Sequence, residues 1–495
     1  MTASISSITA DPQTKDWDEF TQVCRAIQMG DWEKSQEFFS RDKRILTCML
    51  NKNGHRSIHI AIGDPENINF LEKLLEQIDQ ESLPTLVDDK MCNPLHFAAL
   101  VDNLKAAKML VDKNPHLLFQ VDAKEELPIH KAVYKSYKSD KTTFIYFLQA
   151  CKQHIELSEK VGHHNPFEDE HGVRLLDYTI WSGFFDIAYD LLKDYPQLAS
   201  IHIPGLKTPL TSIAQKRDAY LSAERYNFYQ RFVYSHLPYD LEDKYKNKDI
   251  ENQETRSANP KGTKSCFYHV MERIYVKFWE VMLLHVPHIK HLHEDKVKHS
   301  IGLKILELIC KEVSNLKSAD AHYHDAFIFG VINNIPELIE RITRTFPQSI
   351  WSKDDNGYRL SQLSIKNRSD HAYNFLVHNV THCKQIHIML HDKDRNNLLH
   401  LAGQLAPQDK LNMVRGAALQ MQRELQWFQE VRDLIPPMMR EDENKGNETP
   451  IMVQEKLWIL IPIGALTCLP IASFATLQLP LLVELVSSTY LWKST

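Results

Sequence analysis

A short motif that recurs along this chain constrains its fold more than any other feature. Its fullest copy is Asn93-Pro94-Leu95-His96, which is followed by Ala98 and Ala99 and by an apolar run that ends at Pro115. Proline in the first turn of a helix loses no hydrogen bond and presets φ, so the motif predicts the start of a helix. The alanines leave one helix face thin enough for a second helix to approach closely. Such a unit cannot bury its apolar face alone, which predicts similar units on both sides.

Six further copies of the motif occur. Leu127-Pro128-Ile129-His130 lies 34 positions after the first copy. The others are Arg56-Ser57-Ile58-His59, Arg174-Leu175-Leu176-Asp177, Thr208-Pro209-Leu210-Thr211, Arg359-Leu360-Ser361-Gln362 and Asn397-Leu398-Leu399-His400. The pattern resembles the Thr-Pro-Leu-His element of the ankyrin repeat, a unit of about 33 residues with a turn and two helices. We therefore predict an all-α ankyrin-repeat solenoid with two clusters of helix-turn-helix repeats.

The turn before each motif is expected to contain a left-handed residue. Three copies have a glycine five positions before their last residue, namely Gly54, Gly172 and Gly357. Glycine adopts positive φ without strain, so these three positions predict left-handed turns. The equivalent positions of three other copies are Met91, Glu125 and Arg395. The motif histidines His59, His96, His130 and His400 are expected to hold neighbouring turns together and to have no catalytic role.

The chain divides into seven predicted segments. They are a flexible N-terminus at 1–16, a first repeat cluster at 17–237, a polar linker at 238–264, a helical block at 265–319, a second repeat cluster at 320–435, an acidic and proline-containing linker at 436–456, and a transmembrane segment with a short tail at 457–492. The second cluster is expected to end in a long amphipathic helix at 409–434.

One stretch, 457–483, differs from the rest of the chain in its apolar composition: it contains 27 residues and no formal charge. A bilayer core requires about 20 apolar residues, so this stretch predicts a C-terminal transmembrane helix. Its aromatic residues Trp458, Tyr490 and Trp492 are placed as interfacial anchors. The alternative is an apolar helix that packs inside a larger fold.

Charges around this stretch predict its orientation. Arg440, Lys445 and Lys456 precede it, whereas only Lys493 follows it. Because Lys and Arg are enriched on cytoplasmic flanks, the repeats are expected to face the cytoplasm. The absence of an apolar run at 1–16 also predicts that no signal peptide carries the repeats across a membrane. We expect the plasma membrane or the endoplasmic reticulum as the location.

Two phrases carry a family resemblance. NNLLHLAGQLAPQDKLN at 396–412 and GAALQMQRELQWFQEV at 416–431, with the repeats and the apolar C-terminal stretch, resemble plant ankyrin-repeat membrane proteins of the Pro-Gly-Gly (PGG) domain family. The resemblance implies a role in plant defence or stress signalling. No Pro-Gly-Gly occurs in this sequence, so we expect that domain to be missing or reduced to one membrane segment.

Signatures of chemistry are sparse. The densest reactive cluster is His285, His288, His291, His293 and His299. No cysteine or carboxylate completes a recognised zinc spacing there, so we interpret it as a solvated helix and turn and predict no metal site. No catalytic triad, kinase or phosphate-loop signature occurs, which predicts a non-enzyme without a cofactor.

The most direct interpretation is a membrane-tethered scaffold for protein–protein interaction. We expect partner proteins of unidentified kind on the repeat surface, membrane lipid at 457–483, and oligomers through that same segment. A net charge of -6 argues against a nucleic-acid partner. Eight cysteines without paired spacing indicate a reducing compartment. The alternatives are a regulatory subunit of a membrane channel or transporter, and a truncated product with reduced family function.

Overall fold

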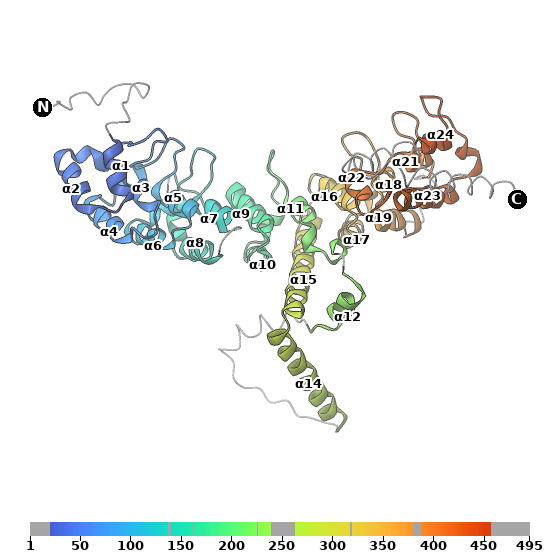
Figure 1. Cartoon of the computed structure of the whole chain (residues 1–495), viewed down its shortest axis with the longest axis horizontal. Coiled ribbons are helices and arrows are strands. Elements are labelled where there is room, and N and C mark those ends of the chain that lie inside the picture. The colour runs from blue at the N-terminus through green and yellow to red at the C-terminus, as the bar shows by residue number, and fades with distance from the viewer. Residues whose placement is uncertain are drawn as a thin grey trace, which may run out of the picture. The chain divides into compact units, whose positions relative to one another are not determined.

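The computed structural model describes residues 20–136, 140–160, 162–224, 226–238, 263–316, 319–379 and 388–456. These residues are helical, and the isolated bridge between Lys353 and Arg359 is the only β pairing among them (Figure 1). The all-α prediction is confirmed for the described ranges. The chain divides into two compact units, Met1–Lys216 and Arg217–Thr495. Residues 217–237, which we assigned to the first cluster, therefore belong to the second unit.

The first unit is built from successive helix pairs. Its α-helices are α1 (Thr21–Gln28), α2 (Trp32–Arg41), α3 (Ser57–Ile62), α4 (Ile68–Gln77), α5 (Pro94–Val101), α6 (Leu104–Lys113), α7 (Pro128–Ser136), α8 (Thr142–Gln153), α9 (Asp169–Trp181), α10 (Phe185–Asp194) and α11 (Pro209–Gln215). The first helices of consecutive pairs, α1, α3, α5, α7, α9 and α11, pack against one another in that order. The second helices α4, α6 and α8 form a parallel row, so the unit has two helical layers with the core between them.

The motif fixes the start of the first helices. Pro94, Pro128 and Pro209 are the first residues of α5, α7 and α11. Asn93 caps α5, because its Oδ1 accepts hydrogen bonds from the amides of Leu95 and His96, both at 3.0 Å. Such a cap contributes about 1 kcal/mol. Thr208 caps α11 in the same way, through the amide of Thr211 at 3.2 Å.

Proline also follows the ends of several second helices. α6 ends at Lys113, and Pro115 then begins a 3-10 helix, η4 (Pro115–Phe119). A proline likewise begins a 3-10 helix after α10, at η6 (Pro196–Ala199), and after α17 in the second unit, at η10 (Pro347–Trp351). Short 3-10 turns also occur at η2 (Lys43–Leu46), η3 (Leu83–Thr85) and η5 (Ile155–Glu159). These turns return the chain toward the first helix of the next pair.

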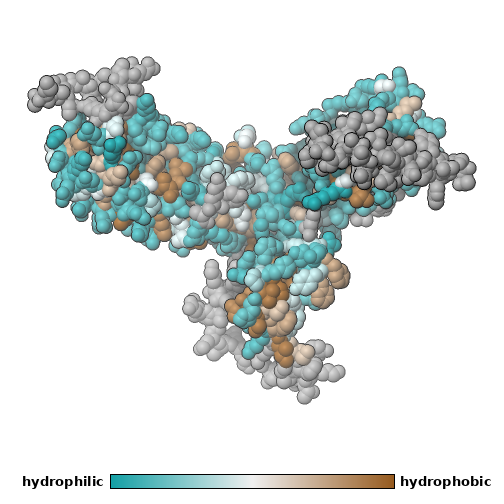
Figure 2. Space-filling model, in the orientation of Figure 1, coloured by the Kyte–Doolittle hydropathy of each residue, from teal (hydrophilic) through white to brown (hydrophobic). Residues whose placement is uncertain are grey.

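The second unit contains longer helices as well as pairs. Its elements are η7 (Arg217–Ala219), η8 (Leu221–Ala223), α12 (Phe228–His236), α14 (Thr263–His285), α15 (Pro287–Ser314), α16 (Asp320–Asn333), α17 (Pro336–Thr345), α18 (Leu360–Lys366), α19 (Asp370–Asn374), the π-helix η11 (Phe375–Asn379), α21 (Leu398–Gly403), α22 (Gln408–Leu411), α23 (Ala417–Leu434), η13 (Pro437–Arg440) and α24 (Pro450–Glu455). The predicted helical block is thus two helices, α14 and α15. α14 exposes the apolar side chains of Ile274, Phe278, Val281 and Leu284 (Figure 2).

Two predictions for the second cluster differ from the structure. The long helix expected at 409–434 begins only at Ala417, because Gly416 has a φ of +95° and separates α22 from α23. The expected linker at 436–456 is a folded part of the cluster. α24 packs on α21, and Gly403 allows this approach, since an added Cβ there would lie 3.0 Å from the carbonyl oxygen of Pro450.

Several predicted segments lie outside the described residues. They include the flexible N-terminus at 1–16, most of the polar linker, and the whole apolar stretch at 457–483 with Trp458, Tyr490 and Trp492. Of the helices that the structure does describe, none combines the length and the apolar character needed to cross a membrane.

Candidate functional site

The turns that precede the motifs share one hydrogen-bond pattern. In five of them, an Asp or Asn side-chain oxygen accepts hydrogen bonds from the amides two and four residues later; these residues are Asn51, Asp88, Asp122, Asp392 and Asn444. For Asp88 both distances are 2.8 Å. The carboxylate or amide therefore closes the turn from within. This device was not anticipated from the sequence, although an Asp or Asn eight positions before the motif's last residue is its signature.

Left-handed residues occupy the expected place in these turns. Gly54 has a φ of +72° and Gly357 a φ of +86°, which confirms both predictions. Met91, Glu125 and Arg395 adopt the same conformation without glycine, at φ values of 58°, 57° and 60°. Asn447, at 55°, marks one more such turn, before Thr449-Pro450. The Asp or Asn oxygen holds the turn closed even where the left-handed residue has a side chain.

Gly172 does not lie in a left-handed turn, so that prediction is wrong. The residue is inside α9, which begins at Asp169 and so starts a full turn earlier than the motif implies. Its small size is nevertheless required. An added Cβ would lie 2.5 Å from Cδ2 of Leu198 and 2.8 Å from the carbonyl carbon of Phe167. Close packing, and not backbone conformation, is the reason for glycine here.

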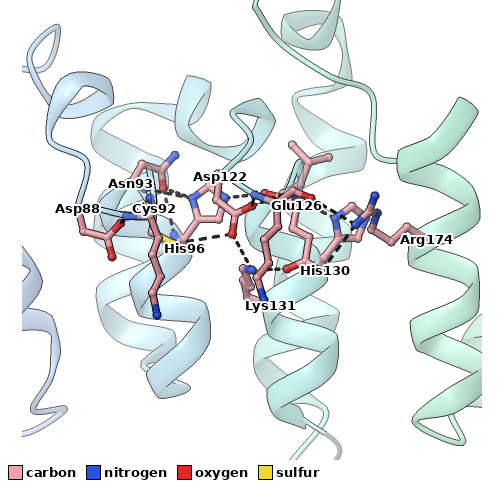
Figure 3. A network of polar contacts seen from close by, with 12 residues as sticks. Asp88, Cys92, Asn93, His96, Asp122, Glu126, His130, Lys131 and Arg174 are labelled. Atoms are coloured by element: carbon pink, nitrogen blue, oxygen red, sulfur yellow. Dashed lines mark hydrogen bonds and ion pairs between the residues drawn. The ribbon is translucent and has the colours of Figure 1, made fainter. Parts of the chain in front are cut away.

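Each motif histidine connects its helix to a backbone carbonyl that precedes or begins the first helix of the next repeat; Figure 3 shows His96 and His130. His96 Nε2 lies 2.9 Å from the carbonyl oxygen of Glu126, and its Nδ1 accepts from the amide of Asn93 at 3.2 Å. His59, His130 and His400 make the equivalent Nε2 contacts to the carbonyls of Cys92, His171 and Glu448, at 3.2, 3.0 and 2.9 Å. Because Nδ1 is an acceptor, Nε2 carries the proton and the ring is neutral.

Burial keeps these rings neutral. His96 and His130 are fully buried, and burial lowers the pKa of His96 to about 4 and that of His130 to about 3. Burial likewise lowers the pKa of His59 to about 4. A ring without solvent access, with both nitrogens hydrogen-bonded to backbone, is not placed to exchange protons with a substrate. The four histidines therefore act in the scaffold of the repeats, as expected.

An ionic cluster lies beside this histidine row. The Lys131 ammonium is 2.6 Å from a carboxylate oxygen of Asp122 and also pairs with Glu126, which accepts a hydrogen bond from the hydroxyl of Tyr178. Burial alone would raise the pKa of Asp122 and Glu126. The pKa of each is nevertheless lowered, because Lys131 acts together with backbone amides at Asp122 and with the Tyr178 hydroxyl at Glu126. Arg174 pairs with Glu170 at the edge of the cluster. The cluster joins α7 to α9, and its two cations are each paired with a carboxylate of the cluster.

Aromatic side chains line the first helices above this scaffold. Phe97 on α5 and Tyr178 on α9 follow directly after the last residue of their motifs, and Tyr134 and Trp181 lie four positions after it. Tyr134 is 62% exposed and Trp181 48%, and their rings stack with centroids 6.2 Å apart. We call Phe97, Tyr134, Tyr178 and Trp181 the aromatic row. It was not recognised in the sequence, and aligning the motifs by their last residue reveals it.

The described residues contain no group of three or more His, Cys, Asp or Glu side chains arranged to hold a metal ion. The histidines of α14 and α15 have separate surroundings. His291 contacts Asp295 at 3.1 Å, whereas His299 is buried and lies 3.0 Å from the hydroxyl of Tyr234. His291 and His299 therefore have different partners.

Comparisons with known proteins identify no family. No family model matches the chain, and no curated protein matches it. Among solved structures, a chain in the crystal structure of the yeast ribosomal protein Rps3 in complex with its chaperone Yar1 is similar at 18% identity. That match covers 28% of this chain and 95% of the other, with a TM-score of 0.24.

Proposed function

We propose that this protein is a membrane-tethered ankyrin-repeat protein whose first unit binds a partner protein. The observation that carries the proposal is the aromatic row, in which Tyr134 and Trp181 expose large rings on the consecutive first helices α7 and α9. Tyr and Trp are enriched among the residues that dominate binding energy at protein interfaces. Repeat units that stack in one dimension offer such a surface to a partner along their length.

The occupant that fits is a protein segment that packs apolar side chains against the exposed surfaces of the stacked Tyr134 and Trp181 rings. Lys131 is paired with both Asp122 and Glu126, so it offers no free positive charge to an acidic ligand. The recurrent turns, the histidine links and the Pro-Leu helix starts support the ankyrin assignment. The tether is the apolar stretch at 457–483, and the cytoplasmic placement of the repeats follows from the flanking charges. Resemblance to the PGG-domain family supplies plant defence or stress signalling as the context.

A quantitative affinity purification tests the proposal. The full-length chain, the double variant Tyr134→Ala/Trp181→Ala and the control Phe228→Ala are purified from native membranes in the same detergent. Phe228 is 87% exposed but lies on α12, outside the aromatic row. We expect one or more proteins to be retained by the wild type and the control and lost by the double variant, since each anchor contributes about 2 kcal/mol. Equal recovery with the double variant would refute the proposal.

A further inference from the structure

A cleft in the second unit carries positive charge that the fold leaves unpaired. Its volume is ≈ 470 Å³, within the range of small-molecule binding sites. Residues of α16, α19, α22, α23 and η7 form its walls. The charged side chains that line it are Arg217, Arg368, Asp370, Lys410, Arg423, Glu424 and Glu430.

One ion pair in the cleft is complete. Arg368 Nη2 lies 2.6 Å from Oε2 of Glu424, and both side chains are 3% exposed. The same guanidinium donates to the carbonyl oxygens of Ile365 at 2.8 Å and Gln404 at 2.6 Å. This pair attaches α23 to the turns before it, and its hydrogen-bonding groups are already used. It forms a wall of the cleft and is not a ligand for a bound molecule.

Lys410 is in the opposite situation. Lys410 is only 7% exposed, yet its ammonium makes no ion pair or hydrogen bond with any described residue. Burial lowers the pKa of this ammonium; Asp409 and Asp370 oppose that effect, and Arg217 and Arg423 add to it. Removing a charge from water costs several kcal/mol unless a counter-charge offsets it. Within the described parts of the chain, no such counter-charge contacts Lys410.

Two arginines add to the charge. Arg423 Nη1 donates only to the backbone carbonyl of Lys410, at 3.2 Å. Arg217 has no side-chain partner in the described ranges. Two carboxylates offset part of this charge: Asp370, which also accepts a hydrogen bond from Asn334 at 2.6 Å, and Glu430, which is exposed. Lys410, Arg423 and the exposed Arg217 therefore face two carboxylates, which leaves an excess of one positive charge among the side chains that line the cleft.

We propose that this cleft binds the phosphate group of a small phosphorylated molecule. Lys410 supplies a point charge at the wall, and Arg423 and Arg217 supply the planar forks that bind phosphate oxygens in pairs. A phosphate monoester carries up to two negative charges, so it suits three cations better than a single carboxylate does. The indole of Trp427, which also lines the cleft, provides an apolar wall for the rest of the ligand. This site is independent of the aromatic row and of the proposed partner.

Isothermal titration of the full-length chain in a non-ionic detergent, with inorganic phosphate as the probe, tests the site. We expect binding that weakens at least about tenfold, equivalent to about 1.4 kcal/mol, in Lys410→Met and in Arg423→Gln. Lys311→Met, an exposed position on α15 outside the cleft, should bind like the wild type. Wild-type protein that does not bind phosphate, or variants that bind it unchanged, would overturn the proposal. Acetate that binds as tightly as phosphate would also overturn it.

A melting experiment separates binding from folding. Without phosphate, Lys410→Met should melt at or above the wild-type temperature, because an unpaired buried charge has been removed. With phosphate, only the wild type and Lys311→Met should gain stability. Glucose 6-phosphate and the deacylated headgroup glycerophosphoinositol 4-phosphate then distinguish the source of the ligand. Tighter binding of the headgroup assigns a lipid, and tighter binding of the sugar phosphate assigns a soluble metabolite.

Discussion

At the scale of single residues, the repeats depend on side chains that satisfy backbone groups. A residue with a Cβ loses about 1–2 kcal/mol in the left-handed conformation. Met91, Glu125 and Arg395 adopt it because an Asp oxygen in the same turn accepts two amides, each bond being worth about 1 kcal/mol. The left-handed position of these turns can therefore be occupied either by glycine or by a residue with a side chain. The Asp or Asn is the part that five turns share.

Replacing that Asp tests its importance. Asp88→Ala leaves the amides of Lys90 and Cys92 without their acceptor and should lower the free energy of unfolding by about 2–3 kcal/mol. The neighbouring Asp89 is exposed, and Asp89→Ala should change it by less than about 0.5 kcal/mol. Urea denaturation of both variants measures the difference. Equal midpoints would mean that the turn does not depend on the carboxylate.

The buried histidines make stability depend on pH. His59, His96 and His130 have pKa values of about 4, 4 and 3 in the folded chain, against 6.5 when exposed. Below pH 6.5 the unfolded chain therefore binds more protons, and stability is lost as the pH falls from 6.5 toward 4. Each histidine contributes at most about 1.4 kcal/mol per pH unit in that window.

Urea midpoints between pH 7.5 and 5 measure this loss. In His96→Gln the urea midpoint should fall less steeply with decreasing pH, although the variant is less stable at pH 7.5. His288→Gln, at an exposed position, should follow the wild type at every pH. A wild-type midpoint that stays constant from pH 7 to 5 would contradict the neutral assignment.

At the scale of elements, local pattern was sufficient for helix starts and ends. Proline presets φ and removes a donor wherever it stands, so Pro94, Pro128 and Pro209 announce helices without reference to the rest of the fold. The sequence was insufficient where distant contacts decide. α24 begins at Pro450 after the same kind of turn as the other motifs, but its membership of the cluster depends on its packing on α21 and on the bond from His400 to Glu448, 48 positions later. The prediction of a left-handed turn at Gly172 was wrong for the same reason, because the glycine is required by a tertiary contact with Leu198.

The contribution of α24 is measurable. A chain that ends at Ile435 should unfold with on the order of 3 kcal/mol less free energy in the second unit than one that ends at Lys456. It loses the burial of Val453 and the acceptor of His400. Glu448→Ala in the longer chain keeps the backbone carbonyl and should be nearly neutral. If both chains melt alike, α24 is not part of the folded cluster.

At the scale of the whole molecule, the proposed membrane topology, with the repeats on the cytoplasmic side, can be tested directly. Protease added to intact microsomes should digest the repeats, and sodium carbonate should leave the chain in the membrane pellet. The sequons at Asn367, Asn379 and Asn447 should carry no glycan, because cytoplasmic segments do not meet the glycosylation machinery. Glycan on Asn367, or protection of the repeats from protease, would show that the repeats lie on the opposite side of the membrane. Release by carbonate would show that the stretch at 457–483 is not a membrane anchor.

The histidine links also set an order for synthesis on the ribosome. His59 finds its acceptor 33 residues later, His96 30 residues later and His130 41 residues later. At about 5–20 residues per second, each ring waits about 2–8 s before its partner has been translated. During that interval the imidazole is hydrated and open to protonation. No repeat of this row can therefore complete its histidine link before the start of the next repeat has been translated.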